Sequence, residues 1–220
     1  MIRAMSSTAP ATRSDWVEER LRTAILRGEL EPGQRLHAND LAERWSVSAT
    51  PLREAFQRLA GYGLVEMLPQ RGARVSQVSV DEASGIYDLR LQLEPVALRR
   101  SLEVTDEEHR DEIRTAFHAL RRAATLDAGV EAHSQLHAIL LSRCPSPWML
   151  RLTGQLADAS RLFQVTSVAS GSKRRHPVKE HKAIVDAAVA GDIDRCVALH
   201  KQHLHRTLEL IGATATGATT

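Results

Sequence analysis

One stretch of this 220-residue chain, GYGLVEMLPQRGARVSQV at residues 61–78, alternates apolar and polar residues on both sides of the tetrapeptide PQRG. Successive side chains point to opposite faces of a strand, so this alternation predicts two half-buried β-strands. The Pro- and Gly-containing tetrapeptide between them predicts the turn of a β-hairpin. Apolar residues recur at helical spacing before the hairpin, and no alternating, strand-like pattern is found after Val80. We therefore expect a small domain that ends in the hairpin, followed by a domain of a different kind.

The first part of that small domain is expected to be a tail and a helix. Residues 1–14 are small and polar without periodicity, which is typical of a flexible tail. A helix is expected to follow, with Asp15 as its cap and Gly28 at its C-cap. Its apolar residues recur at helical spacing: Val17, Leu21, Ala24 and Ile25.

The remaining signals complete a known order of elements. EPGQRL predicts a turn and a short strand, and residues 39–45 predict a short helix. SVS predicts a tight turn, after which Ser48 is expected to be the N-cap of a helix that runs to about Ala60. Helix, strand, helix, turn, helix and hairpin is the order of a winged helix-turn-helix, which we place at residues 15–77.

Beyond Val80 the pattern predicts an all-α bundle of about six helices. Ser79 with acidic residues behind it starts one helix, and TDEE at residues 105–108 has the form of a capping box. Four further helices are expected, at about 128–143, 147–167, 176–190 and 192–211. The fold class is therefore mainly α, with a second domain at residues 80–212 and a flexible tail at 213–220.

Composition limits the class of protein. Hydrophobic residues make up 43% of the chain, enough for ordinary cores, and neither a signal-peptide h-region nor an apolar stretch of membrane-spanning length is found. We therefore expect a cytoplasmic protein without a membrane partner. Cys144 and Cys196 are too scattered for a thiolate zinc site or a disulfide framework and are expected in the core. Up to Val78 there are eleven arginines, no lysine and nine acidic residues, a slight excess that permits nucleic-acid binding.

The helix after Ser48 has two different faces. Its buried stripe is expected to consist of Leu52, Ala55, Phe56 and Leu59. The opposite face carries Thr50, Arg53 and Gln57, and an Arg one turn into a helix can reach the O6 and N7 edge of guanine in a major groove. A solvated polar face on a packing helix is the alternative interpretation.

The segment LHANDLAERWSVSATPLREAFQRLAGYGLVEMLPQRGARV resembles the winged helix-turn-helix of GntR-type bacterial transcription regulators, including the core VSxTPLREAxxRLxxxGLV and the wing RGxxV. This resemblance implies a regulator that binds double-stranded operator DNA. Carried over by position, it implies DNA contacts from Thr50 and Arg53, with Gln70, Arg71 and Gly72 at the wing tip near the minor groove or backbone. Ser48 and Gln57 of the same helix and Asn39 of the helix before it are further candidate contacts.

Three departures from the family pattern bear on the operator. The family usually has Arg at the position of Ala49 and often Arg at Asn39, and each loss removes a strong contact, worth about 1–3 kcal/mol if it reads a base. Ser46 replaces the usual turn Gly, at a modest conformational cost. We therefore expect an atypical operator that is bound in the family's usual mode.

Four histidines of the second half are expected to point inward. His133 and His137 lie one turn apart, His181 precedes an apolar stripe, and His203 follows one. Four imidazoles from three helices are costly to bury unpaired, and a shared metal ion would satisfy them together. From spacing alone, hydrogen-bonded core histidines remain the more common alternative.

HSQLHAILL, EHKAIVDAAVAGD and HKQHL resemble the FCD-type effector-binding domain of the FadR-like branch of the GntR family. The metal-binding members have Asp-x-x-x-His, then His in EHxxI, then His in the last helix, which implies His137, His181 and His203 as ligands. His133 stands at the Asp position. An imidazole there favours Zn²⁺, Ni²⁺ or Cu²⁺ over Mn²⁺ or Mg²⁺, with Zn²⁺ the first expectation. A three-His or empty site is the alternative.

The resemblance also implies a small carboxylate effector that completes the metal's coordination shell. Arg90 matches an Arg of the domain's first helix and is a candidate partner for that carboxylate. A surface ion pair with Glu94 at i+4 is the competing interpretation. His176, His200 and His205 are expected in loops or on the surface; the alternative for His200, one turn before His203, is a supporting contact to the metal ligands. SKRRH at residues 172–176 is expected to be solvated charge or a dimer contact.

These features predict a homodimeric, ligand-responsive regulator, usually a repressor in this family, that binds a palindromic operator. A metal-dependent enzyme is the rival class, but no Glu or Asp stands at the spacing of a known metallohydrolase motif. A regulator with a vestigial site and no effector is the third possibility.

Overall fold

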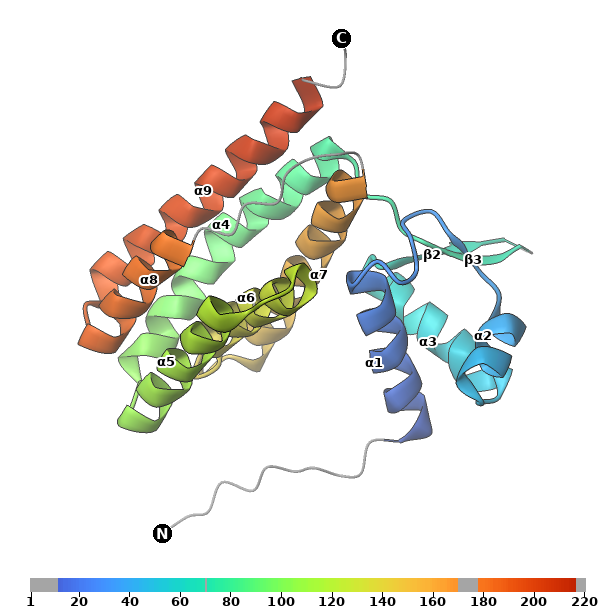
Figure 1. Ribbon diagram of the computed structural model, residues 1–220, viewed down its shortest axis with the longest axis horizontal. Coiled ribbons are helices and arrows are strands. Elements are labelled where there is room, and N and C mark those ends of the chain that lie inside the picture. The colour runs from blue at the N-terminus through green and yellow to red at the C-terminus, as the bar shows by residue number, and fades with distance from the viewer. Residues whose placement is uncertain (1–11, 70, 170–177, 217–220) are drawn as a thin grey trace. The chain divides into compact units, whose positions relative to one another are not determined.

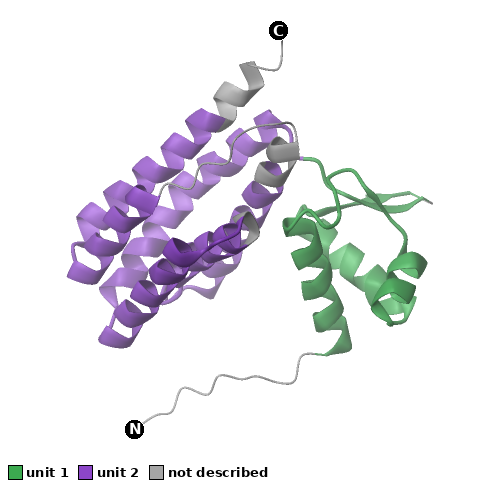
Figure 2. Ribbon diagram, in the orientation of Figure 1, with its two compact units in different colours: residues 1–77 green, residues 78–220 purple. Residues whose placement is uncertain are grey.

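The computed structural model describes residues 12–69, 71–169 and 178–216. The chain divides into two compact units, residues 1–77 and residues 78–220, which Figure 2 distinguishes by colour. The first unit mixes helices with a small sheet, and the second is helical throughout its described residues. The mainly α fold class, a winged helix-turn-helix with an all-α domain, is confirmed.

The first unit has the element order of a winged helix. α1 (Arg13–Leu26), β1 (Arg35–Leu36), α2 (Ala38–Trp45) and α3 (Ala49–Gly61) precede the hairpin of β2 (Val65–Leu68) and β3 (Gly72–Val75). The strands form one antiparallel sheet in the order β1-β3-β2, with Leu36 opposite Ala73 and Val65 opposite Val75. The short strand and the hairpin predicted from alternation are therefore both present.

α1 begins earlier than its periodicity indicated. The predicted Asp15 cap is wrong: Thr12 is the N-cap, and its hydroxyl accepts a hydrogen bond from the Asp15 amide while the Asp15 carboxylate accepts one from the Thr12 amide. This reciprocal pair is a capping box, in which the acidic residue stands three positions after the cap. Residues 12–14 thus belong to the folded unit rather than to the tail; residues 1–11 lie outside the described part.

α2 and α3 are joined through a left-handed residue. Ser46, the C-cap of α2, has φ 53° and ψ 45°, and it is the one non-glycine residue with positive φ among the described residues. α3 then buries Leu52, Ala55, Phe56 and Leu59, as its stripe predicted. α3 packs against α1, whose Val17, Leu21, Ala24 and Ile25 are also buried.

The second unit is a helical bundle. Its elements are α4 (Val80–Glu103), α5 (Glu107–Arg122), α6 (Leu126–Leu141), α7 (Pro147–Ala169), α8 (Val178–Ala190) and α9 (Ile193–Thr216). α4 packs against α9 and α7, α5 against α6 and α8, and α8 against α9, as Figure 1 shows. The larger core joins side chains of α4, α5, α6, α8 and α9 and includes both cysteines.

Two boundaries in this unit differ from expectation. Asp106, rather than Thr105, caps α5 by accepting a hydrogen bond from the His109 amide, while the Thr105 hydroxyl donates to the Ser101 carbonyl. α9 continues to Thr216, so the predicted tail from residue 213 begins too early.

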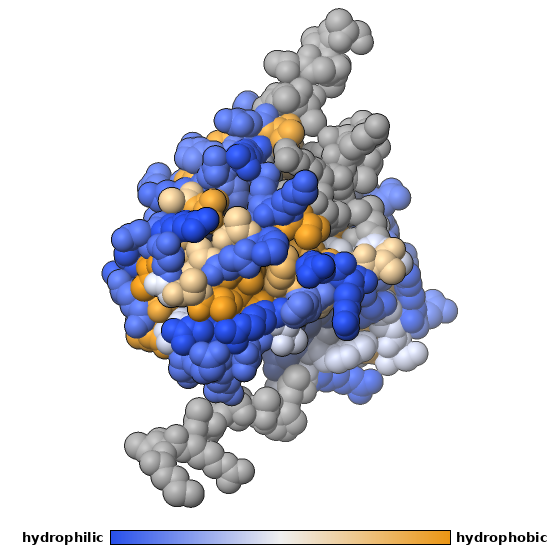
Figure 3. Space-filling model, turned by 60° about the vertical axis from the view of Figure 1, so that its left-hand side comes forward, coloured by the Kyte–Doolittle hydropathy of each residue, from blue (hydrophilic) through white to orange (hydrophobic). Residues whose placement is uncertain are grey.

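Within the described residues no helix is both long and apolar enough to span a membrane. Figure 3 shows apolar side chains gathered inside a hydrophilic rim on one face.

Candidate metal centre and DNA-binding surface

The recognition helix α3 presents a polar, solvent-exposed face. Thr50, Arg53 and Gln57 are exposed while Leu52 and Phe56 on the other side are buried, because residues three and four apart share a helix face. Ser48 is the N-cap as predicted, but its side chain makes no capping hydrogen bond, which leaves the hydroxyl on the surface.

The arginines of the first unit fall into two groups. Arg58 is tied to Glu18 of α1 and Arg74 to Glu66 across the hairpin, so both serve the fold. Arg53 and Arg71 are exposed and make no ion pair within the described part of the chain. The second group therefore presents its charge to solvent.

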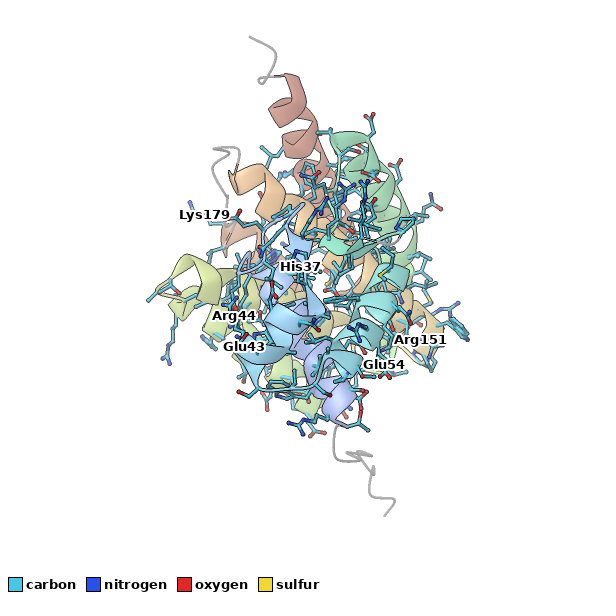
Figure 4. All side chains as sticks on the ribbon, turned by 90° about the vertical axis from the view of Figure 1, so that its right-hand side faces the viewer. His37, Glu43, Arg44, Glu54, Arg151 and Lys179 are labelled. Atoms are coloured by element: carbon cyan, nitrogen blue, oxygen red, sulfur yellow. The ribbon has the colours of Figure 1, made fainter. Side chains whose placement is uncertain are left out.

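The other predicted DNA contacts lie at the edges of this unit. Asn39 is exposed in the first turn of α2, and Gly72 opens β3 with φ 84°, a conformation that favours glycine at the wing. Gln70 lies outside the described residues. Figure 4 shows further exposed side chains of the same unit, His37, Glu43 and Arg44 at α2 and Glu54 on α3.

In the second unit, His133, His137, His181 and His203 come together. They lie on α6, α8 and α9, and one nitrogen of each lies within 4.8 Å of the corresponding nitrogens of the others. Nε2 of His137 and Nε2 of His181 are 3.0 Å apart, close to the roughly 3.3 Å expected between neighbouring ligands of tetrahedral zinc. His137, His181 and His203 are buried, and His133 is half-buried. We call these residues the four-His cluster.

The four-His cluster favours neutral imidazoles. Burial and then the neighbouring imidazoles hold the pKa of His137 well below its ordinary value, and burial followed by His181, His200 and Arg90 does the same for the pKa of His203. A neutral imidazole has the lone pair that a metal ion needs. The residues present therefore fit a divalent transition metal with nitrogen ligands.

A buried polar network lies beside the four-His cluster. Arg90 Nε donates to Glu94 Oε1, Arg90 Nη1 donates to Ser160 Oγ at 2.8 Å, and His200 Nε2 lies 2.9 Å from Glu94 Oε2. Burial alone would raise the pKa of Glu94, but the Arg90 guanidinium and His200 outweigh it and lower that pKa to about 2. Glu94 is thus a carboxylate held between two donors.

This network corrects two predictions. The ion pair of Arg90 with Glu94 forms, but it is buried rather than on the surface, with side chains 8% and 2% exposed. The surface placement of His200 is wrong, because its side chain is 1% exposed and pairs with a carboxylate 106 residues away. Cys196 at i−4 and Leu204 at i+4 are both buried and carry the sequence signal that could have placed His200 inward.

A second set of close ligand atoms, from Glu94, His137 and His200, shares His137 with the four-His cluster. The Arg90 guanidinium occupies one oxygen of Glu94 and repels a cation, so the four-His cluster is the better metal position. His205 is exposed, as predicted. His176 and the SKRRH segment lie outside the described residues.

Comparison with known families agrees with both units. Residues 85–206 match the FCD domain, and residues 13–75 match the family described as bacterial regulatory proteins, gntR family. The FCD match alone covers more than half of the chain.

Similar proteins include curated regulators and solved structures. The HTH-type transcriptional regulator BphR of Paraburkholderia xenovorans (strain LB400) is 29% identical over 205 residues, which cover 88% of this chain and 82% of that protein. The HTH-type transcriptional repressor GlaR of Escherichia coli (strain K12) is 25% identical over 202 residues, 87% and 92% of the two chains. The structure of E. coli McbR/YncC has a TM-score of 0.81 at 20% identity, over 92% of this chain and 98% of that one, and shows the same fold.

Proposed function

Because the chain belongs to the GntR family of bacterial regulatory proteins and carries an FCD domain, we propose that it is a homodimeric repressor whose operator binding responds to a small carboxylate held at a metal ion. It is a DNA-binding transcriptional regulator and not an enzyme. The four-His cluster carries the finer part of the proposal, because it offers neutral nitrogen ligands from three helices within 4.8 Å of one another.

DNA recognition rests on α3 and the wing. Arg53, with Thr50 and Gln57 on the same exposed face, reads base edges in the major groove, while Arg71 at the wing neutralises phosphate. A palindromic operator follows if two copies are related by a two-fold axis. The name of one relative, a transcriptional repressor, supports repression as the mode of action.

Dimerisation is supported by exposed apolar residues of the second unit. Leu89 and Val96, seven residues apart on α4, are 49% and 44% exposed, and Trp148 and Leu152, four apart on α7, are 69% and 42% exposed. Spacings of four and seven place each pair on one helix face, and α4 packs against α7. Large apolar residues gathered in this way are typical of an association surface.

The effector site is built around the four-His cluster. A metal ion bound there, most simply Zn²⁺ and alternatively Ni²⁺, would accept a carboxylate oxygen by taking a ligand beyond the four histidines, or as the fourth ligand where only three histidines bind. His137, His181 and His203 hold the ion, and His133 adds a fourth nitrogen where the family has Asp. Arg90 lies close enough to this site to lower the pKa of His203, but Glu94 offsets its charge, so an effector carboxylate would compete with Glu94 for the guanidinium.

The proposal is tested by metal analysis and DNA binding with one set of proteins. Protein as purified is expected to contain about one zinc or nickel ion per chain, lost in His137→Ala and kept in His205→Ala, because His205 is exposed. A gel shift with the gene's own promoter, with and without chelator, then reports whether the metal affects operator binding. Sequence-independent binding would contradict a specific regulator.

A regulator with a vestigial site is the second candidate, favoured by His133 at the family's Asp position. It predicts no bound metal, and it predicts that His137→Ala leaves thermal stability and DNA release unchanged. Either result would remove the effector part of the proposal and leave the DNA-binding part intact.

A further inference from the structure

The last ligand of the four-His cluster has a carboxylate behind it. Nδ1 of His203 lies 3.2 Å from Oε2 of Glu180, a residue next to His181 on α8. An ionised carboxylate only accepts hydrogen bonds, so the shared proton is on Nδ1 of His203. The lone pair of His203 is then on Nε2, the nitrogen left for the cluster.

Glu180 is itself held in place. Its other oxygen, Oε1, lies 3.0 Å from Nη1 of Arg206, one turn beyond His203 on α9. Its side chain is 13% exposed and that of His203 is 8% exposed, so water competes little for either group. Glu180 therefore joins α8 to α9 through two charged or polar contacts of defined direction.

We propose that Glu180 is a positioning residue for the metal centre: it fixes His203 as the Nδ1–H tautomer and aims Nε2 at the ion, with Arg206 orienting the carboxylate. A carboxylate behind a ligating imidazole fixes its tautomer and raises its basicity, and losing it typically costs about 10- to 100-fold in metal affinity. This inference rests on the proposed function, since it needs the four-His cluster to bind metal.

Three variants separate the role of Glu180 from that of its neighbours. Glu180→Ala removes the acceptor, whereas Glu180→Gln keeps an acceptor oxygen without the charge, and His203→Ala removes the ligand. Glu131→Gln is the matched control. The carboxylate of Glu131, on α6, lies 3.2 Å from Nη2 of Arg161, on α7, so this variant also loses an Arg–Glu ion pair.

The first readout is zinc affinity, measured on the full chain by competition with a chromophoric chelator at neutral pH. Glu180→Ala is expected to bind zinc about 10- to 100-fold more weakly than the unmodified chain, with a smaller loss in Glu180→Gln and none in Glu131→Gln. The second readout is the tautomer of His203 in metal-free protein, from long-range ¹H–¹⁵N imidazole spectra. It should be Nδ1–H in the unmodified chain and lose that preference in Glu180→Ala.

The outcomes are distinguishable. Unchanged zinc affinity in both Glu180 variants, with zinc lost in His203→Ala, would overturn the positioning role and leave the metal centre standing. An unmodified chain that binds neither zinc nor nickel overturns this inference and the metal-dependent part of the proposed function, and leaves the DNA-binding part intact. If Glu180→Ala fails to fold by circular dichroism, the near-isosteric Glu180→Gln and the tautomer of the unmodified chain still decide the question, and an Nε2–H tautomer there overturns the inference.

Discussion

The two units of this regulator place their functional side chains in opposite environments. In the first unit, the side chains of Thr50, Arg53 and Gln57 on α3 are exposed, so they are expected to contribute little to the stability of the fold. In the second unit, Arg90 and three members of the four-His cluster, His137, His181 and His203, are buried, and Arg90 is paired with Glu94 inside the bundle. An exposed side chain of α3 can therefore be changed at little cost to the fold, whereas a buried and paired side chain of the helical unit cannot be changed without changing stability.

The largest expected effect is on the buried arginine. Arg90→Ala leaves Glu94 as a buried carboxylate without its main partner, which is expected to destabilise the helical unit by about 3–5 kcal/mol. Chemical denaturation measures this loss. Arg53→Ala, the matched exposed arginine, should shift stability by less than about 0.5 kcal/mol. The double variant R90M/E94Q removes both charges but keeps an acceptor for His200, and it should regain most of the loss. Equal stability of R90A and R53A would remove the contrast between the units.

The next largest expected effect is that of low pH on the stability of the helical unit. The folded pKa values of His137 and His203 are lowered, so both histidines stay neutral in the fold while the unfolded chain takes up protons below its ordinary pKa of about 6.5. Stability of the metal-free helical unit is thus full above pH 6.5 and falls as the pH drops below it, by up to about 1.4 kcal/mol per pH unit for each group.

Thermal unfolding of metal-free protein between pH 7.5 and 5.5 measures this fall. His137→Leu removes one of the two groups and should give a shallower pH dependence, whereas His205→Ala, at an exposed position, should not change it. A flat profile in the unmodified chain would contradict buried neutral imidazoles.

DNA affinity should respond directly to the exposed arginines of α3 and the wing. Arg53→Ala is expected to weaken operator binding by about 1–3 kcal/mol and to relax base preference at one position of each half-site. Arg71→Ala, if it loses only a phosphate contact, should weaken binding to all sequences alike and reduce the salt dependence. Fluorescence anisotropy over a range of salt concentrations distinguishes the two. If Arg53→Ala keeps its affinity for the operator, the exposed face of α3 is only a solvated surface and does not contact bases.

The sequence predicted the helices and strands better than the contacts that side chains make between them. Periodicity placed the buried stripe of α3 and brought four histidines to inward positions, because both depend on spacing within one helix. The same spacing did not predict the burial of His200, because that burial depends on Glu94 in a different helix. It also did not predict the role of Glu180 on α8, which directly precedes His181 in the sequence and contacts His203 on α9. Local caps were misplaced for a related reason: Thr12 and Thr105 compete with nearby acidic residues, and only backbone geometry decides between them.

The smallest expected effect concerns Ser46, the one non-glycine residue with positive φ among the described residues of the first unit. Ser46 ends α2 with φ 53°, a conformation that costs a residue with a Cβ about 1–2 kcal/mol. Ser46→Gly removes that cost but gives the unfolded chain more freedom, worth about 0.4–1 kcal/mol, so a net gain between about 0 and 1.6 kcal/mol is expected. Ser46→Ala keeps the Cβ and should give no gain.

Denaturation of full-length S46G and S46A, followed by a probe in the first unit such as Trp45, measures the difference. The pH dependence of the helical unit should be the same in both variants, because Ser46 lies in the other unit. If S46G also changes zinc affinity or the acid sensitivity of the four-His cluster, the two units are energetically coupled in the absence of DNA. Such coupling would mean that effector binding and operator binding already influence each other through the turn between α2 and α3.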